Sequence, residues 1–543
     1  MAQVEIAFDA PAVDWWVLTP QIILVGAALG LLLAASLAPR ALPGWVSTIV
    51  TIATGAATAI TAAVQWNDWG SAPRSTLKDA FVSDGFSLLL TVLVGAGVVM
   101  TALVAHSALD RYEMAPPEFA ALLLASAAGA VVMAGANDLI VLFLGLESLS
   151  IALYVLIALA GRRASARESA MKYFVLGAFS SAFFLYGIAL VYGSTGSTNL
   201  SGIGGFLFGS IRETDYLLLA GIALLLVGLG FKVAAVPFHF WAPDVYEGAP
   251  SPVTGYLASI AKAAGFAALA RVLYVAVAEQ SIAWAPILIG LAFATLAVGA
   301  VMAICQNDVK RMLAYSSISH AGFVLVGLSA VAGSGEAARW MVKVAGEESL
   351  ILTTGATGAV SSAVFYLIAY SFMALGSFAV LSVFGSEQQT ADASAGGTDA
   401  SSPHALSRYG GLARRRPVLA LAFTVLLLAQ AGVPLTAGFV AKFEVIRAAI
   451  DASGYVLAAV AMVTAVVSAF AYLRVVLAMY APEGQADADE SAPAARAGRQ
   501  RWGGLPLTSV FAISLAVAVT VVVGVLPQTL LEWSRDAVLS IIL

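Results

Sequence analysis

Residues 216–241 read YLLLAGIALLLVGLGFKVAAVPFHFW, an apolar run that contains Lys232 and, five residues later, Pro237. A helix needs about 20 apolar residues to cross a bilayer, and this run is long enough. Proline lacks a backbone donor and interrupts a helix, so the run should break beside its lysine. Irregular backbone at membrane depth is stable only where it is buried in protein or lines water. The run therefore predicts a broken membrane helix with a buried cation beside a hydrated half-channel.

The rest of the chain has the same apolar character. Of its 543 residues, 60% are hydrophobic and 11% are charged, whereas a soluble domain carries roughly 25% charged residues. We place 14 stretches of membrane-spanning length, and they start near residues 16, 45, 85, 117, 138, 169, 215, 252, 284, 310, 361, 416, 455 and 505. We therefore expect an all-α polytopic membrane protein of about 14 transmembrane helices, with both termini on one side.

The distribution of Lys and Arg predicts which side that is. Basic residues are more frequent in loops after odd-numbered stretches than in loops after even-numbered ones. Most of the excess comes from Arg162, Arg163, Arg167, Lys310, Arg311 and Arg414 to Arg416. Basic loops remain in the cytoplasm, so both termini should face the periplasm or its equivalent. No Lys or Arg precedes Arg40, so the first stretch lacks a basic secretory leader and should remain as an anchor.

Several classes of site are disfavoured by composition. The net charge of -5 is spread without a basic stripe, which argues against nucleic-acid binding. Cys305 is the only cysteine, so the chain has neither an intrachain disulfide nor a Cys set for an iron–sulfur cluster. The four histidines (106, 239, 320 and 404) lie singly, and no GxGxxG turn is present. We expect no metal and no cofactor in this chain.

Two charged residues fall near the predicted middle of the membrane. Glu147 lies nine residues beyond Asp138, which is about 14 Å along a helix, and Lys262 lies ten residues beyond Pro252, about 15 Å. A charge at such depth costs at least about 2.5 kcal/mol, and residues that carry one usually mark ion paths. The alternative for Glu147 is a structural carboxyl bound to a neighbouring helix. Lys262 is too deep to extend its ammonium easily to the surface.

Other candidates are more ambiguous from spacing alone. Lys232 could be a lysine at a helix end whose ammonium extends to the membrane surface. His320 lies ten residues after Lys310 with serines nearby, and a single buried histidine serves either as a relay or as a structural residue. Lys172 is one turn into its stretch, so we expect an ion-pair partner or a residue at which protons enter.

A second interrupted run occurs at residues 417–450, PVLALAFTVLLLAQAGVPLTAGFVAKFEVIRAAI. Gly432, Pro434 and Gly438 interrupt it before Lys442. Paired interrupted segments in corresponding positions of two halves point to transporter repeats and their ion sites. The two broken stretches are five apart, which predicts two five-helix repeats related by inversion. By spacing alone, Lys442 could equally lie at the membrane interface.

This pattern divides the chain into four parts. We expect the first three helices in 1–116, the repeats in 117–280 and 281–480, and a linker with the last helix in 481–543. Residues 385–404 and 481–500 are rich in small, polar or acidic residues and predict flexible cytoplasmic linkers. Residues 334–350 are expected to form a short surface helix on the opposite side, to which we assign no function.

Four motifs together resemble subunit N of bacterial complex I, the proton-translocating NADH:quinone oxidoreductase, which belongs to the antiporter-like subunit family. They are KYFVLGAFSSAFFLYG (172–187), FKVAAVPFHFWAPDVYEGAPSPV (231–253), NDVKRMLAYSSISHAGFVL (307–325) and PLTAGFVAKF (434–443). The resemblance extends over about residues 115 to 480. Within it, DVYEGAP and the lysine at position 442 are similar to subunit N rather than to its paralogues L and M.

The resemblance implies a 14-helix antiporter-like fold with inverted five-helix repeats and a central hydrophilic axis. It assigns proton-path roles to Glu147, Lys232, Lys262 and Lys442. It also implies that NADH, FMN, iron–sulfur clusters and quinone belong to partner subunits, and that this chain lies in the bacterial inner membrane beside paralogous antiporter-like subunits. The segments 334–350, 385–404 and 481–500 depart from the family pattern.

The expected function is therefore proton translocation driven by redox chemistry in partner subunits. Burial destabilises a charged lysine and a nearby carboxylate stabilises it, so movement of Glu147 relative to Lys232 would release a proton toward Lys262 and Lys442. The main alternative is a subunit of an Mrp-type cation/proton antiporter. A third alternative is a purely structural membrane anchor for other subunits, in which Glu147 and the three lysines could be replaced by neutral residues without harm.

Overall fold

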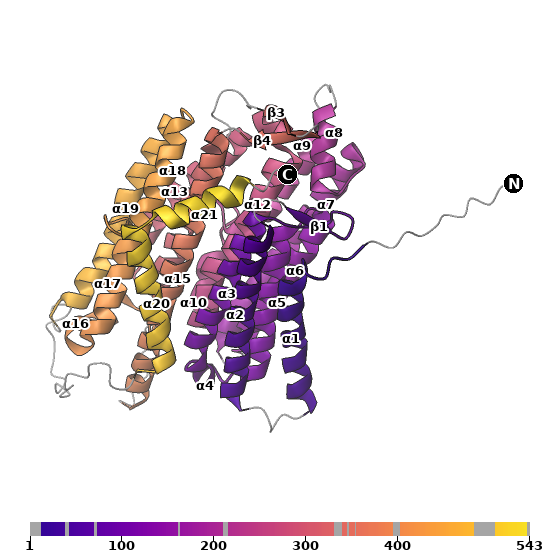
Figure 1. The fold of residues 1–543 in the computed structure, drawn as a ribbon. Helices are drawn as coiled ribbons and strands as arrows, with labels where there is room; N and C mark the ends of the chain where they lie inside the picture. The colour runs from indigo at the N-terminus through magenta and orange to yellow at the C-terminus, as the bar shows by residue number, and fades with distance from the viewer. Residues whose placement is uncertain are drawn as a thin grey trace.

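The computed structural model describes residues 12–37, 43–69, 73–160, 163–209, 215–330, 339–344, 347–352, 354–394, 402–482 and 505–539. Long helices dominate it (Figure 1). Within those ranges, thirteen segments are long and apolar enough to cross a membrane, and Pro417–Ala431 is a shorter apolar helix. Together they account for the 14 predicted stretches. The largest difference in a start is that of α15, which begins at Thr354 rather than near residue 361.

The continuous spans are α1 (Thr19–Leu37), α2 (Gly44–Trp69), α3 (Gly85–His106), α5 (Pro116–Gly135), α6 (Leu139–Ala158), α7 (Ala164–Thr195), α13 (Ser281–Ile304), α14 (Val309–Ser329), α15 (Thr354–Ser394), α19 (Tyr455–Tyr480) and α20 (Leu507–Val525). The span between residues 251 and 276 consists of α11 (Ser251–Tyr256), the π-helical turn η1 (Leu257–Ala261), α12 (Lys262–Arg271) and the π-helical turn η2 (Val272–Ala276).

Two spans are broken, as predicted. They are α9 (Tyr216–Val233) with α10 (Trp241–Gly248), and α17 (Pro417–Ala431) with α18 (Ala437–Asp451). The shorter elements are α4 (Leu109–Tyr112), α8 (Leu200–Gly209), η3 (Ala278–Gln280), η5 (Leu406–Tyr409), α16 (Leu412–Arg415), α21 (Gln528–Leu539) and the strands β1 (Arg74–Thr76) and β2 (Phe81–Ser83).

Aspartates fix the starts of three helices that carry candidate site residues. Asp138, Asp215 and Asp308 precede α6, α9 and α14, and each carboxylate accepts hydrogen bonds from backbone N–H groups of the first turn. Such caps satisfy donors that the helix itself cannot satisfy. Each capping aspartate also lies at the end of an apolar run, where a membrane helix tolerates a charged side chain.

The helices form two groups that pack side by side. In Figure 1 the first half of the chain, coloured indigo to magenta, lies beside the second half, coloured orange to yellow. The long helix α15 joins the groups, because it contacts α3 and α11 on one side and α18 and α20 on the other. The last helix, α21, crosses the bundle and contacts α3 and α15.

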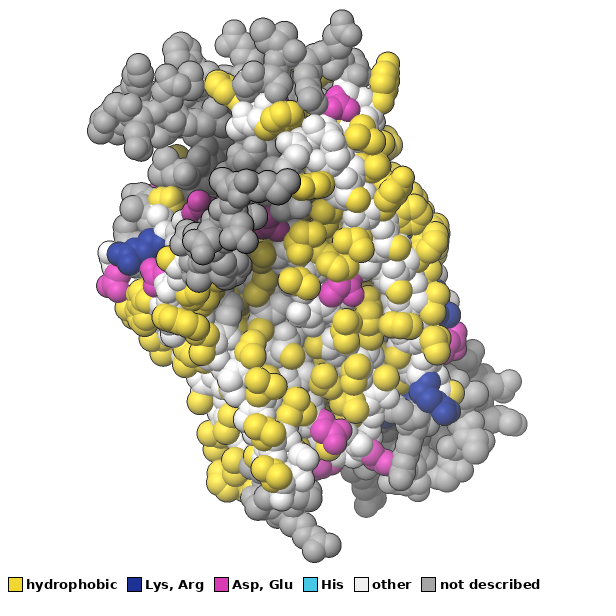
Figure 2. Space-filling model, turned by 90° about the vertical axis from the view of Figure 1, so that its right-hand side faces the viewer, with side chains coloured by type: hydrophobic (Ala, Val, Ile, Leu, Met, Phe, Trp, Pro, Cys, Tyr) yellow, Lys and Arg dark blue, Asp and Glu magenta, His cyan; other side chains and the backbone are white. Residues whose placement is uncertain are grey.

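The outer surface is apolar. Leu33 on α1, Phe179 on α7 and Val466 on α19 are each more than half exposed, and the face in Figure 2 is covered largely by hydrophobic side chains. A soluble protein rarely exposes so extensive an apolar surface. By contrast, α14 and the span 251–276 are almost wholly buried inside the protein, so their polar side chains do not face lipid.

The expectation of a surface helix over residues 334–350 is wrong. Strand β3 (Arg339–Val344) pairs with the antiparallel strand β4 (Glu347–Leu352). Trp340, Val342 and Val344 alternate along β3, and aromatic and β-branched residues with this spacing favour an extended chain. Residues 334–338, 345 and 346 lie outside the described residues.

The linker predicted at 385–404 is shorter than expected, because α15 continues to Ser394. Residues 395–401 lie outside the described residues. At the far end of the predicted linker, the carbonyl oxygen of His404 accepts a 2.9 Å hydrogen bond from the N–H of Val309, and Ser402 Oγ donates to Asp308 at 2.5 Å. This end is therefore fixed to the start of α14. Of the second predicted linker, residues 483–500 lie outside the described residues.

His404 itself is packed into the protein. Its ring lies against Gly385, where a Cβ atom would come within 2.7 Å of its Cε1. Burial, together with Lys310 and Arg163, lowers the pKa of His404 to about 3. The imidazole is therefore neutral at physiological pH. The polar composition of residues 385–404 did not reveal that His404 is buried.

Candidate functional site

The first broken helix places Lys232 beside its break. Helix α9 ends at Val233, and Ala234 adopts a left-handed conformation with φ 59°. Residues 234–240, which include Pro237, separate α9 from α10. The indole N–H of Trp241 donates a 2.9 Å hydrogen bond to the carbonyl oxygen of Phe231. The same carbonyl oxygen also accepts from the N–H of Ala234 at 3.0 Å, so Trp241 adds a second donor that ties the segment after the break to the end of α9.

Lys232 is buried among hydroxyl groups. Its Nζ donates to Ser150 Oγ on α6 at 2.8 Å and to the hydroxyl of Tyr173 on α7 at 3.4 Å. Its aliphatic stem lies against Gly265 of α12. The predicted alternative, an ammonium that extends to the surface, does not describe this geometry.

Glu147 lies half-buried on α6, where Ser181 Oγ of α7 donates a hydrogen bond to its carboxylate. Among the described residues it makes no ion pair with Lys232. A small cavity lies beside Lys232, lined by this lysine, by Ser150, Ser180, Ser181 and Tyr154 and by apolar residues, and it leaves about 10 Å³ for the centre of a water molecule. That volume is about the minimum that holds one water. A single water could therefore connect the serine that binds Glu147 to the lysine.

Lys262 begins α12, directly after the π-helical turn η1. Its buried Nζ donates to both Ser317 Oγ, at 2.6 Å, and the Ser317 carbonyl oxygen, at 2.9 Å. The ring of Tyr246 on α10 lies 5.8 Å from the ammonium, within the range of a cation–π interaction. Lys262 therefore contacts both α14 and the segment after the first break.

His320 lies three residues beyond Ser317 on α14 and is buried. Its Nδ1 is 2.6 Å from the hydroxyl of Tyr366, and its Nε2 is 3.0 Å from that of Tyr472. The ring of Tyr370 stacks on the imidazole at 4.5 Å between centroids. Both ring nitrogens therefore have hydroxyl partners, which either tautomer can satisfy because a hydroxyl donates or accepts.

The second broken helix holds Lys442 differently. The buried Nζ donates to the carbonyl oxygens of Gln430, at 2.8 Å, and Ala431, at 2.9 Å, in the last turn of α17. Gly432 follows with φ 93°, a conformation that favours glycine. Gly438 allows α18 to approach this helix end, because a Cβ there would lie 1.9 Å from the carbonyl oxygen of Ala429. Lys442 therefore lies in the protein interior.

Lys172 differs from the other lysines because its side chain is at the protein surface. Its Nζ pairs with Glu168 at 2.7 Å and with Asp244 at 2.8 Å. The structure thus gives it ion-pair partners, one of the two roles expected from its position. It has no hydrogen bond or ion pair with the other predicted site residues.

The sequence alone did not identify the hydroxyl groups that bind Lys232 and His320. Ser150 and Tyr173 lie within the apolar runs of their helices, and Tyr366 and Tyr472 are distant in sequence from His320. Their contacts depend on helix packing, so no local pattern marks them. Ser316 and Ser317 were expected near His320, but Ser316 bonds to Tyr472, and Ser317 accepts from Lys262.

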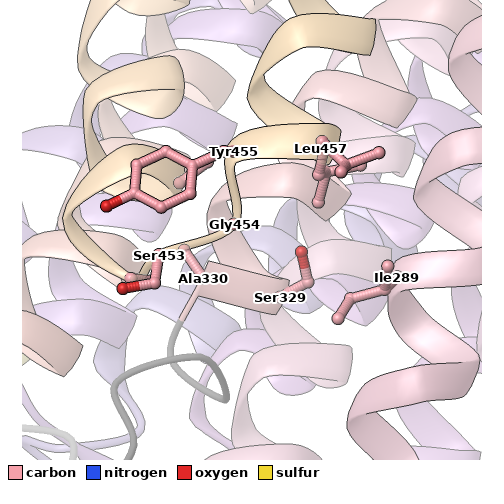
Figure 3. Close-up of a pocket in the computed structure, with 10 residues that line it drawn as sticks. Ile289, Ser329, Ala330, Ser453, Gly454, Tyr455 and Leu457 are labelled. Carbon is pink, nitrogen blue, oxygen red and sulfur yellow. The ribbon is translucent and has the colours of Figure 1, made fainter.

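A second cavity lies away from this set. It has a volume of about 230 Å³ and lies where α14, α18 and α19 end or begin. Figure 3 shows Ile289, Ser329, Ser453, Tyr455 and Leu457 among the residues that line it. Its lining is mostly apolar and contains no Lys, His, Asp or Glu. In the described ranges, no three His, Cys, Asp or Glu side chains gather as a possible metal site.

Comparison with known proteins finds a match to the family described as NADH:quinone oxidoreductase/Mrp antiporter, TM, over residues 136–346 and 349–468. NADH-quinone oxidoreductase subunit N from Mycobacterium bovis is 42% identical over 79% of this chain and 72% of its own length. A chain of respiratory complex I from Thermus thermophilus superposes with a TM-score of 0.70 at 32% identity, covering 94% of this chain and 98% of that one. A chain of the Mrp complex from Dietzia sp. superposes with a TM-score of 0.76 at 22% identity, covering 96% and 97%.

Proposed function

The chain belongs to the NADH:quinone oxidoreductase/Mrp antiporter family, and from that premise we propose that it is a proton-translocating membrane subunit, of the subunit N type, in an NADH:quinone oxidoreductase. The observation that supports this proposal best is the set of three lysines, Lys232, Lys262 and Lys442, buried in an apolar bundle without ion pairs among the described residues. Ionisable groups within membrane spans are rare and usually serve ion transport.

In the proposed mechanism, Glu147 controls the charge of Lys232. Burial destabilises the ammonium, and a carboxylate nearby stabilises it. The cavity beside Ser150 and Ser181 can hold one water that lets the carboxylate act on the lysine. When Glu147 is charged and close, Lys232 retains its proton. When Glu147 is neutral or withdraws, Lys232 releases the proton to the interior.

The proton then passes from Lys262 toward Lys442. Ser317 connects Lys262 to α14, and His320 lies one turn further along that helix. With a hydroxyl at each ring nitrogen, the imidazole can accept a proton on one side and donate one on the other. His320 is thus proposed as the relay between the two lysines.

The driving free energy must come from partner subunits. Moving one charge against 100 mV requires about 2.3 kcal/mol, and we assign no redox group to this chain. We propose that NADH, FMN, iron–sulfur clusters and quinone bind in partner subunits of the complex. This chain would then be its non-redox, proton-translocating component, in contact with paralogous antiporter-like subunits.

The architecture suggests how the path is divided. We assign residues 117–280 and 281–480 to two five-helix repeats related by inversion, each with one broken helix. The excess of Lys and Arg in alternate loops supports an inner-membrane orientation with both termini on the periplasmic side. Lys172 lies on the opposite side by this assignment, where it can exchange protons with the cytoplasm through its partners.

An Mrp-type antiporter subunit is the alternative function, favoured by the similar fold of the Dietzia Mrp chain. That likeness is at 22% identity, and the DVYEGAP motif at residues 244–250 supports the subunit N type instead. Inverted vesicles from a strain lacking this gene separate the two. We expect proton pumping driven by NADH to disappear and to return with the wild-type gene. Undiminished NADH-driven pumping in the deletion strain would contradict the proposed function.

A further inference from the structure

The short helix α10 is bound to both of its neighbours by charged groups. Toward α7, Asp244 Oδ2 accepts from Lys172 Nζ at 2.8 Å, and the Asp244 carbonyl oxygen accepts from Ser169 Oγ at 2.9 Å. Toward α14, Arg311 pairs with Asp244 at 3.0 Å and with Glu247 at 2.5 Å. We call the pairs of Arg311 with Asp244 and Glu247 the α10 bracket.

The residue before Arg311 reinforces the contact. Lys310 is buried, and its Nζ donates to the carbonyl oxygens of Ala249, at 2.5 Å, and Glu247, at 3.2 Å. These carbonyl groups are at the end of α10, where the helix cannot satisfy them and where a cation is favourable. Two consecutive cations at the start of α14 thus bind the side chains and the carboxyl end of α10.

The inner side of α10 faces the lysine sites. Trp241 stacks on Tyr173 at 4.5 Å between centroids, and Tyr173 is a hydrogen-bond partner of Lys232. Tyr246 lies with its ring 5.8 Å from the ammonium of Lys262. One eight-residue helix therefore contributes to the surroundings of two buried lysines that lie on different helices.

We propose that the α10 bracket fixes the geometry between the two lysine sites: Arg311 holds α10 against α14, and Asp244 and Glu247 are positioning residues for proton transfer at Lys232 and Lys262. Helix α14, which carries Arg311 in its first turn, also carries Ser317, the acceptor of Lys262, and then His320. The α10 bracket thus fixes the position of α10 relative to Ser317 and His320. Its ion pairs remain formed throughout the pumping cycle. The inference rests on the proposed function and adds specific residues to it.

The first test removes the charge at Arg311. In membrane vesicles containing the whole complex, Arg311→Gln should lower the protons pumped per NADH oxidised roughly threefold or more, as mutations that alter coupling do. Arg311→Lys should restore most of the loss, since it keeps a cation near both carboxylates. Glu247→Gln combined with Arg311→Gln should be no worse than Arg311→Gln alone, because both act through one contact. Full pumping by Arg311→Gln, or no recovery with Arg311→Lys, overturns the proposal.

Two controls complete this test. Arg447→Gln removes a cation that pairs with Glu444 and Asp451 on α18 and should leave pumping unchanged, and an equal loss there would overturn the claim that the α10 bracket is special. Lys262→Met tests the proposed function itself. Loss with Lys262→Met but not with Arg311→Gln refutes the bracket alone, whereas full pumping by Lys262→Met refutes the function on which it rests.

The second test asks whether the bracket stays closed. Cysteines are introduced as Glu247→Cys and Arg311→Cys after Cys305→Ser has removed the native thiol, and a reducible bifunctional thiol reagent joins them. Complex with only Cys305→Ser receives the same reagent as the control. Because the bracket is proposed to be fixed, the cross-linked complex should pump at least as well as the same variant before cross-linking. A loss on cross-linking that reductant reverses would show that the contact must open, and would overturn the proposal.

Discussion

The two broken helices bind their lysines by different means. Lys232, at the end of α9, donates to two side-chain hydroxyls, those of Ser150 and Tyr173. Lys442, near the start of α18, donates to two main-chain carbonyl oxygens at the end of α17. The first lysine shares a small cavity with Ser181, which donates a hydrogen bond to Glu147, whereas within the described residues no acidic group pairs with the second.

These different partners indicate that the charges of Lys232 and Lys442 are controlled in different ways. The carboxyl end of a helix carries a partial negative charge and fixed acceptors, so α17 stabilises a cation by itself. Hydroxyl groups rotate and can donate as well as accept, so the partners of Lys232 suit both its charged and its neutral form. We infer that the charge of Lys232 depends on Glu147, whereas that of Lys442 depends on the backbone of its own broken helix.

Replacing Lys442 should give the largest effect. We expect Lys442→Met to reduce proton pumping at least about tenfold, because it removes the buried ammonium that binds the end of α17. Lys442→Arg should also impair pumping, because arginine keeps the positive charge but does not release its proton. Pumping by reconstituted complex is measured with a pH-sensitive dye, and quinone reduction by the detergent-solubilised complex should fall less. Wild-type pumping by Lys442→Met would remove this residue from the path.

The Lys442→Arg variant separates two roles of Lys442, hydrogen bonding to the end of α17 and proton transfer. If Lys442 only donates hydrogen bonds to the carbonyl groups of Gln430 and Ala431, Lys442→Arg should pump normally and Lys442→Met should fail. That outcome would leave Lys232 and Lys262 as the remaining lysines of the path.

Replacing Glu147 tests the first break and should have the next largest effect. Glu147→Ala should lower pumping several-fold while assembly remains intact, because it removes the charge that stabilises protonated Lys232 without opening a large void in the core. Glu147→Asp should keep much of the activity. Pumping is measured together with the amount of assembled complex in native gels. Normal pumping in an assembled Glu147→Ala complex would show that the two breaks do not differ in this way.

Much of this comparison could be predicted from the sequence. Proline and glycine interrupt helices for local reasons, so both breaks could be recognised from Pro237, Gly432 and Pro434. The depth of Glu147 and Lys262 follows from helical rise and apolar run length alone. Residues 334–350 were expected in a helix because their charges suggested a surface segment, although the alternation of residues in β3 favours a strand.

The partners of the charged groups could not be predicted in the same way. Tyr366 and Tyr472 approach His320 from helices far away in sequence, and the 12-residue separation of Gln430 and Lys442 reveals no hydrogen bond until the break folds the chain back. His404 lies in a polar segment, yet helix packing buries it. Such contacts depend on how helices pack, which one sequence does not specify locally.

A glycine substitution gives a smaller effect that is specific to the second break. Gly432→Ala places a Cβ 3.1 Å from Lys442 Cδ at a φ of 93°. We expect a loss of about 1 kcal/mol in stability from the backbone conformation and, in addition, reduced pumping because the side chain of Lys442 must shift. The matched control is Gly196→Ala, at φ 71° with no atom within 4 Å of the added Cβ. It should share the loss of stability, measured by thermal inactivation, but pump normally.

The smallest expected effect is that of Ser150→Ala, which removes an acceptor of Lys232 without removing a charge. Hydrogen bonds to charged groups contribute about 1.5–3 kcal/mol, but a water in the adjacent cavity can replace the hydroxyl, so pumping should fall only about twofold by this argument. Ser180→Ala is the matched control, because Ser180 lines the same cavity but donates to the carbonyl oxygen of Gly228, at 3.4 Å. Its pumping should be unchanged. The second break has no equivalent of this substitution, since its acceptors belong to the backbone. A loss of pumping with Ser150→Ala as large as that with Lys442→Met would mean that Lys232, like Lys442, depends on fixed acceptors. The proposed difference between the two breaks would then be wrong.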